Sequence, residues 1–121
     1  MSPVQSPIVQ DKITRSSHDV TWIVHWRTGK SLPCKASYEV AFVNWCNVHG
    51  IDFDWQIRHT MPSGETYIVD ALIKDGVRAN TYVEIKGYMR PDALRKWEWF
   101  KSHYPNAELW DKVKLREVGV L

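Results

Sequence analysis

Ile68–Ile73 (IVDALI) and Tyr82–Gly87 (YVEIKG) are the two segments that decide the fold predicted by this sequence. Both are apolar and rich in β-branched residues, which favours strands. The polar stretch Lys74–Gly76 between them contains residues that favour a turn. If the two strands pair in one sheet, Asp70 comes beside Glu84, so two carboxylates meet within apolar surroundings.

Three charged side chains, those of Asp70, Glu84 and Lys86, carry the chemical hypothesis. Side chains alternate along a strand, so Glu84 and Lys86 are expected on one face. Charges in apolar surroundings are costly unless they are paired or hold a metal ion. Taken alone, residues of these types more often form a solvated strand face with a cross-strand ion pair.

A divalent cation would remove the repulsion between the two carboxylates. Mg²⁺ is typically held by one or two carboxylates, with water and substrate phosphate completing its shell. In this hypothesis the backbone carbonyl of Ile85 adds an oxygen ligand, and Lys86 orients or activates a water molecule. These groups fit hydrolysis of a phosphodiester. The sequence has no nucleophile turn for acyl transfer, no Gly-rich phosphate loop and no dinucleotide fingerprint.

Composition predicts one domain of ordinary globular type. The chain has 121 residues, 25% of them charged, and a formal net charge of only +2, so a nucleic acid would have to bind to a local basic patch. Seven Trp and five Tyr suit a dense core or a surface that stacks on bases. The two cysteines show no metal-ligand spacing, and no segment resembles a signal or a membrane span, so we expect a cytoplasmic protein.

Hydrophobic periodicity predicts an α+β domain over residues 20–121, preceded by an irregular arm over residues 1–19. The expected strands cover Val20–Arg27, Phe53–Arg58, Ile68–Ile73, Tyr82–Gly87 and Ala107–Trp110. The expected helices begin at Ser37, Pro91 and Asp111 and end near His49, Tyr104 and Val118. Ser37 is expected to cap the first helix, and Gly50 to end it in a left-handed conformation.

The spacing of the charged residues resembles the PD-(D/E)XK nuclease motif. Asp70 is followed by thirteen residues and then Glu84-Ile85-Lys86, and Lys35–Glu39 (KASYE) resembles the helix start that opens the core of phage-type members. The closest likeness is to small phage or homing-endonuclease-like proteins and to phage junction-resolving endonucleases. The resemblance implies a restriction-endonuclease-like core, with a central mixed sheet flanked by helices. One departure is Val69, which stands where the family usually has Pro.

The resemblance also implies a role for individual residues. Asp70 would hold the main metal ion, Glu84 would be the second carboxylate, and Lys86 would attend the nucleophilic water. Glu39 would complete the metal shell directly or through water, although an acid in the first turn of a helix also serves as a partner of the helix dipole. Gln56 is a secondary candidate on the polar face of its strand. The expected cofactor is Mg²⁺, with Mn²⁺ as a substitute.

The expected partner is DNA. Phosphate contacts are assigned to basic side chains near the site or before the first helix, namely Lys30, Lys35, Arg78, Arg90, Arg95 and Lys96. A chain this small has one active site, so cutting both strands of a duplex favours a homodimer. Two alternatives stay open: a catalytically inactive DNA-binding or interaction module on the same fold, and a structural protein in which Glu84 and Lys86 form a surface pair.

Overall fold

The computed structural model describes residues 19–121 and divides the chain into two compact units, one ending at Gly50 and the other comprising Ile51–Leu121. Apart from Asp19, the predicted N-terminal arm lies outside the described residues. The single domain expected over residues 20–121 stays a prediction, and each unit is described by itself.

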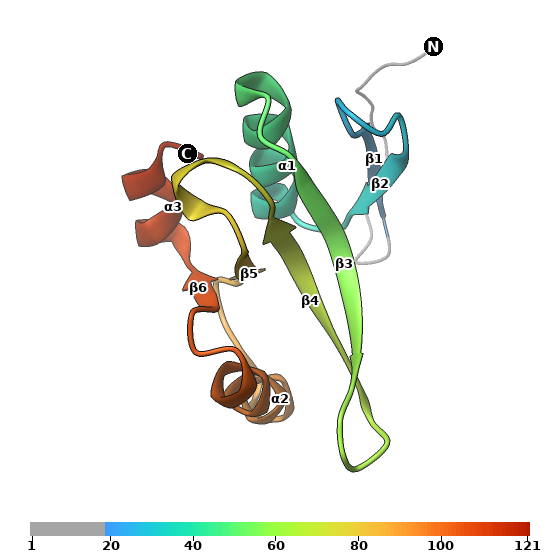
Figure 1. Cartoon of the computed structure of the whole chain (residues 1–121), viewed down its shortest axis with the longest axis vertical. Coiled ribbons are helices and arrows are strands. Elements are labelled where there is room, and N and C mark those ends of the chain that lie inside the picture. The colour runs from blue at the N-terminus through green and yellow to red at the C-terminus, as the bar shows by residue number, and fades with distance from the viewer. Residues whose placement is uncertain (1–18) are drawn as a thin grey trace. The chain divides into compact units, whose positions relative to one another are not determined.

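The first unit is a hairpin joined to a helix. Its elements are β1 (Thr21–Val24), β2 (Ser31–Cys34) and α1 (Ser37–His49), with β1 antiparallel to β2 (Figure 1). Asn47 of α1 ties the helix to the hairpin: its amide donates to the carbonyl of Val24 at 2.8 Å and accepts from the amide of Trp26 at 3.0 Å. The helix and the hairpin are thus held together by directional bonds.

The sequence predicted the C-terminal end of α1 correctly but not its N-cap. Gly50 follows the helix at φ 62° and donates to the last carbonyls, so the predicted left-handed cap is confirmed. The N-cap is Ala36 rather than Ser37, which is the first helical residue, and Ala36 makes no side-chain cap bond. The predicted cap was therefore one residue too late, a usual uncertainty at a helix end.

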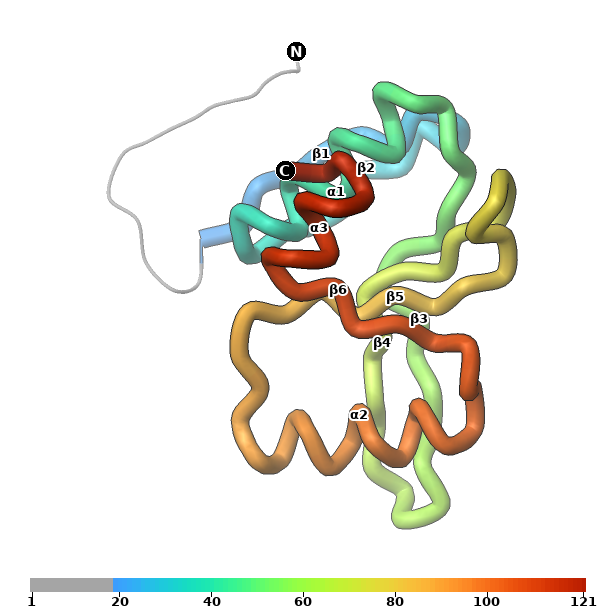
Figure 2. Tube along the Cα trace, turned by 90° about the vertical axis from the view of Figure 1, so that its left-hand side faces the viewer, coloured from blue at the N-terminus to red at the C-terminus, as the bar shows by residue number. Residues whose placement is uncertain are grey.

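The second unit is built on a four-stranded mixed sheet. Its elements are β3 (Phe53–Thr60), β4 (Thr66–Ile73), η2 (Gly76–Arg78), β5 (Thr81–Ile85), α2 (Pro91–His103), β6 (Glu108–Trp110) and α3 (Lys112–Val118). The strand order is β3-β4-β5-β6, antiparallel except for the parallel pair β5–β6, which α2 connects (Figure 2). The predicted α+β class is confirmed.

A cluster of aromatic and aliphatic side chains packs α2 against the sheet. Phe100 of α2 is fully buried and contacts Tyr67 of β4, with ring centroids 5.0 Å apart. The same cluster contains Met61, Val69, Trp97 and Ala107. The packing fixes β4 against α2, and β4 is the strand that carries Asp70.

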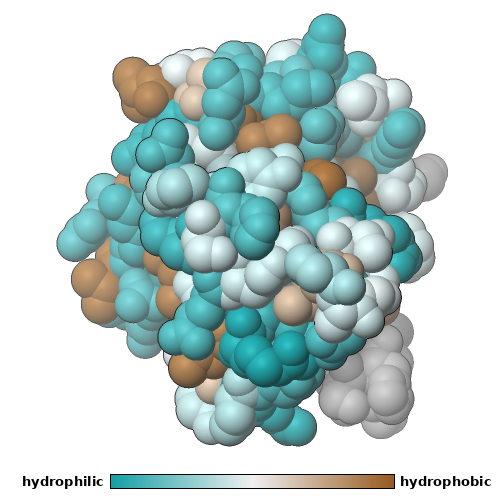
Figure 3. All heavy atoms as spheres, turned by 60° about the horizontal axis from the view of Figure 1, so that its bottom comes forward, coloured by the Kyte–Doolittle hydropathy of each residue, from teal (hydrophilic) through white to brown (hydrophobic). Residues whose placement is uncertain are grey.

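The surface that carries α2 and the β3–β4 turn is mainly hydrophilic, with apolar side chains scattered singly over it (Figure 3). Isolated apolar side chains are normal on a protein surface. Within residues 19–121, no helix has both the length and the apolar character needed to cross a bilayer.

His59 generates a prediction about the pH dependence of stability. Its ring packs between Phe100, Tyr82 and Tyr104, its Nε2 has no hydrogen-bond partner among residues 19–121, and burial lowers its pKa below the usual 6.5. The unfolded chain therefore binds this proton more readily than the folded one, so the free energy of unfolding should fall as the pH drops below about 6.5.

The measurement is chemical unfolding at pH 7 and pH 5 of the wild type and of His59→Phe, which keeps a ring but cannot titrate. We expect a smaller loss of stability on acidification in the variant. Because the other histidines are common to both proteins, the difference isolates His59. Identical pH slopes would contradict the prediction.

Candidate active site

The predicted pair Asp70 and Glu84 lies where the pairing of β4 with β5 stops. The two strands pair from Ile73–Thr81 to Ala71–Val83, and the register continued by one residue would set Asp70 opposite Glu84. At this point the amide of Ile85 donates to Oδ2 of Asp70 at 2.7 Å. A side-chain oxygen of β4 has therefore become the acceptor for an amide of β5.

The neighbouring amide shows which way β5 faces. The amide of Lys86 donates to the carbonyl of Trp110 in β6 at 3.3 Å. Successive amides of a strand point to opposite neighbours, so the amide of Ile85 points toward β4. Its bond to the Asp70 carboxylate thus replaces a bond along the ladder, and it ties Asp70 to the end of β5.

Gln56 lies on the other side of Asp70. Pairing of β3 with β4 passes from Trp55–Ala71 to Ile57–Val69, so Gln56 is the residue that the register places opposite Asp70. Its φ is 55°, in the left-handed region that residues with a Cβ seldom adopt. Such backbone conformations are frequent at functional sites, because the surrounding structure must hold them in place. The structure thus places this secondary candidate in one row with Asp70 and Glu84.

Glu84 is buried, with only 5% of its surface exposed, and its Oε1 accepts a hydrogen bond from the hydroxyl of Tyr67 at 2.9 Å. The pKa of Tyr67 is raised, first by burial, then by the charge and hydrogen bond of Glu84, and also by the charge of Asp70. The hydroxyl of Tyr67 thus lies at the Glu84 carboxylate, and the register of β4 and β5 sets Asp70 next to this position.

Sequence reasoning missed Tyr67. Tyr67 lies one residue before the expected strand Ile68–Ile73, and one buried Tyr in a chain with five is more often a core residue. Nothing in the local sequence signals that its hydroxyl reaches a carboxylate seventeen residues later. Only the packing of β4, β5 and α2 together reveals the contact.

Lys86 directly follows β5 and is half-buried. Within the described part of the chain, its ammonium makes no ion pair. Ile85 is buried and contributes its amide to the site. That the Ile85 carbonyl binds a metal ion and that Lys86 attends a water molecule stay predictions.

Glu39 belongs to the first unit, whereas Asp70, Glu84 and Lys86 belong to the second. Its Oε1 accepts a hydrogen bond from the backbone amide of Lys35 at 2.9 Å. The carboxylate thus satisfies an amide just before α1, in the manner of a capping box, and it also complements the helix dipole. This bond and the place of Glu39 in the first turn of α1 agree with the helix-dipole alternative that the sequence left open. Its place in a metal shell stays a prediction.

Some of the basic side chains predicted to contact DNA in the second unit already have partners within the fold. Arg95 donates to both carboxylate oxygens of Glu65 and to Asp92, and the hydrogen bond from Arg95 contributes most to lowering the pKa of Glu65 to about 2. Arg78 lies over the ring of Trp110, 5.6 Å from the centroid. These charges already have partners within the fold.

The remaining predicted contacts are more available. The ammonium of Lys96 donates only a long hydrogen bond of 3.4 Å, to the carbonyl of Thr66. Arg90 is exposed at the N-cap of α2 and makes no ion pair with any of the described residues. In the first unit, Lys30 and Lys35 are exposed. Among the basic side chains of the second unit, Arg90 is thus better suited to a phosphate than Arg95.

The chemistry of the acidic pair limits the kind of metal site that it could form. Within residues 19–121, no group of three or more His, Cys, Asp or Glu side chains is arranged to hold a metal ion. A closed site built from three such side chains is therefore not seen in this part of the chain. Two carboxylates with hard oxygen donors fit the open type of Mg²⁺ site, in which water and phosphate supply the other ligands.

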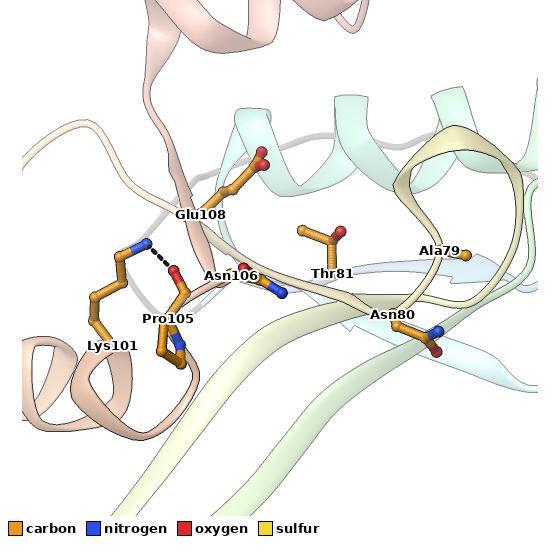
Figure 4. A pocket seen from close by; sticks show the side chains of 7 residues that line it. All are labelled: Ala79, Asn80, Thr81, Lys101, Pro105, Asn106 and Glu108. Atoms are coloured by element: carbon orange, nitrogen blue, oxygen red, sulfur yellow. Dashed lines mark hydrogen bonds between the residues drawn. The ribbon is translucent and has the colours of Figure 1, made fainter.

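A separate hollow of about 600 Å³ lies at the starts of β5 and β6 (Figure 4). It is lined by Ala79, Asn80, Thr81, Lys101, Pro105, Asn106 and Glu108. Lys101 donates to the carbonyl of Pro105 at 2.6 Å, and Glu108 accepts from the indole of Trp110. Its two charged residues are thus used by the local structure, and neither Asp70 nor Glu84 lines it.

Comparisons of this chain with protein-family models, with curated proteins and with solved structures find no match. The resemblance to PD-(D/E)XK nucleases therefore depends on the residues of the chain itself.

The bond between Asp70 and the Ile85 amide generates a prediction about hydrogen exchange. In Asp70→Ala, the Ile85 amide loses its acceptor, so its exchange should accelerate by roughly 10-fold or more. The amide of Lys86, whose acceptor is in β6, should keep its protection. Amide exchange followed by NMR measures both sites in one sample.

Asp70→Asn serves as the matched control, because its side-chain carbonyl can still accept the bond. We expect its Ile85 amide to exchange more slowly than that of Asp70→Ala. Unchanged protection of Ile85 in Asp70→Ala would show that the bond does not hold this part of β5.

Proposed function

We propose that this chain is a metal-dependent DNA endonuclease of the PD-(D/E)XK type. The observation that carries the proposal is the register of β4 and β5, which continued by one residue sets Asp70 opposite Glu84, where the Ile85 amide bonds to Asp70 and the Tyr67 hydroxyl bonds to Glu84. Lys86 follows two residues after Glu84 at the end of the same strand. This arrangement is consistent with the three-residue motif recognised in the sequence.

The proposal includes a restriction-endonuclease-like core. Its support is the order of elements: α1, then the antiparallel strands β3, β4 and β5, then α2 and the parallel strand β6. The first acid of the motif lies on the inner strand β4 and the second on the other inner strand, β5. The sheet thus presents the motif from two adjacent strands.

Asp70, Glu84 and the carbonyl of Ile85 would hold the metal ion, and the resemblance adds Glu39. When bound, Mg²⁺ or Mn²⁺ would polarise the scissile phosphate and lower the pKa of a coordinated water. The carboxylates are hard oxygen donors, as these cations prefer. The bond from the Ile85 amide to Asp70 Oδ2 limits how this carboxylate can rotate.

Lys86 would supply a positive charge two residues after Glu84. Its ammonium can donate hydrogen bonds to the attacking water and offset the negative charge that develops on the phosphorus oxygens. An ammonium in a partly desolvated place stabilises such charge more strongly than it would in water. Cleavage at one such site breaks one strand, so breaking both strands favours two copies of the chain.

The decisive experiment is a cleavage assay with purified protein on branched, nicked and linear DNA, with Mg²⁺ and then with excess EDTA. We expect strand breaks that disappear on chelation. Asp70→Ala and Glu84→Ala should each lower the rate by about 100-fold or more, the scale on which one essential stabilising group acts. Full cleavage by either variant would refute the assignment.

Glu98→Ala is the matched control, since Glu98 is an exposed carboxylate on the outer side of α2. It should cleave like the wild type. If the wild type binds DNA but cuts none of the substrates with Mg²⁺ or Mn²⁺, the catalytically inactive DNA-binding module replaces the endonuclease.

A second prediction compares a basic side chain that is available to bind a DNA phosphate with one whose charge is already paired within the fold. Arg90→Ala should weaken DNA binding and reduce the slope of log affinity against log salt by about 1. Arg95→Ala should change the slope less, because its charge is already shared by Glu65 and Asp92. Binding assayed in EDTA over a salt series measures both, and equal slopes for the two variants would contradict the distinction.

A further inference from the structure

The hydroxyl of Tyr67 and the carboxylate of Glu84 form a buried hydrogen bond of 2.9 Å. Tyr67 is 6% exposed and Glu84 is 5% exposed, so both groups are largely removed from water. A hydrogen bond to a charged group contributes more than a neutral one, and a buried carboxylate without donors is costly. The bond is therefore a strong restraint on where the Glu84 carboxylate lies.

The ring of Tyr67 is itself fixed by packing. Its centroid lies 5.0 Å from that of Phe100, and the surrounding cluster includes Val69 and Trp97. A tyrosine ring with packed faces has few rotamers, so its hydroxyl occupies a defined position. A tyrosine hydroxyl carries its proton at neutral pH, so it can donate the bond to Glu84.

We propose that Tyr67 is a positioning residue, which holds the Glu84 carboxylate in the orientation in which it binds a divalent cation. The inference rests on the proposed function and adds a residue to it. Carboxylates that bind metal ions are commonly held by such hydrogen bonds, and loss of the bond typically lowers metal affinity by roughly 10- to 100-fold. The Tyr67 ring joins the site to α2, so the packing of Phe100 also supports the position of Glu84.

The test is Tyr67→Phe, which keeps the ring and its packing but removes the hydroxyl. Titration calorimetry without DNA measures the affinity of the protein for Mn²⁺. We expect this affinity to fall by about 10-fold or more in the variant. In cleavage assays, the Mn²⁺ concentration at half-maximal rate should rise by a similar factor, and the rate should recover in part at saturating Mn²⁺. A change in metal affinity with preserved folding is the signature of positioning.

Tyr82→Phe is the matched control. Tyr82 packs against the same Phe100, with centroids 5.1 Å apart, but the bond to Glu84 comes from Tyr67. We expect Tyr82→Phe to bind Mn²⁺ like the wild type. If both variants weaken metal binding equally, the effect belongs to the aromatic cluster as a whole, and the positioning role is overturned.

The outcomes distinguish this inference from the proposed function. If Tyr67→Phe binds Mn²⁺ as the wild type does while the wild type cleaves DNA, the positioning role fails and the endonuclease stands. If the wild type binds no Mn²⁺ and cleaves no DNA, both fail together. Circular dichroism and urea unfolding of each variant establish that the compared proteins are folded.

Discussion

The hydrogen bond from the Ile85 amide to the Asp70 carboxylate is the interaction on which the arrangement of the site depends. It substitutes a charged side-chain acceptor for a backbone carbonyl, and such bonds contribute about 1.5–3 kcal/mol. The pairing of β4 with β5 stops there, while the next amide along the chain, that of Lys86, bonds to Trp110 of β6. Strand β5 thus separates from β4 while the amide of Ile85 keeps a hydrogen-bond acceptor. Asp70 and Glu84 lie where the two strands separate.

The second constraint is the burial of Glu84, which requires a donor that water no longer supplies. Tyr67 provides it, and Phe100 of α2 holds the ring of Tyr67. The parallel connection from β5 through α2 to β6 therefore has a chemical as well as a topological role. It brings an aromatic helix face against β4 and fixes the donor that the buried acid needs.

Local signals in the sequence predicted several features correctly. Pro91 begins α2, Gly50 ends α1, and Asp111 caps α3 through a bond from the amide of Lys114 at 2.9 Å, as expected from residue types that act on their immediate neighbours. β2 was missed because it is short and contains Pro33. Phe42, Val43 and Cys46 of α1 are fully buried, which the start and end signals of the helix do not indicate, because the rotation of a helix depends on what packs against it. For the candidate site, the motif indicated Asp70 and Glu84, whereas the Ile85 and Tyr67 bonds arise only when distant segments meet.

The left-handed conformation of Gln56 has a consequence for anyone who engineers this protein. A residue with a Cβ raises the free energy of the folded state by roughly 1–2 kcal/mol at such a position, and glycine would avoid most of this penalty. Selection for heat resistance alone would therefore favour glycine at position 56. Selection for activity would instead keep glutamine there if its side-chain amide contributes to the reaction. Comparing the two selections would reveal whether position 56 is retained for folding or for chemistry.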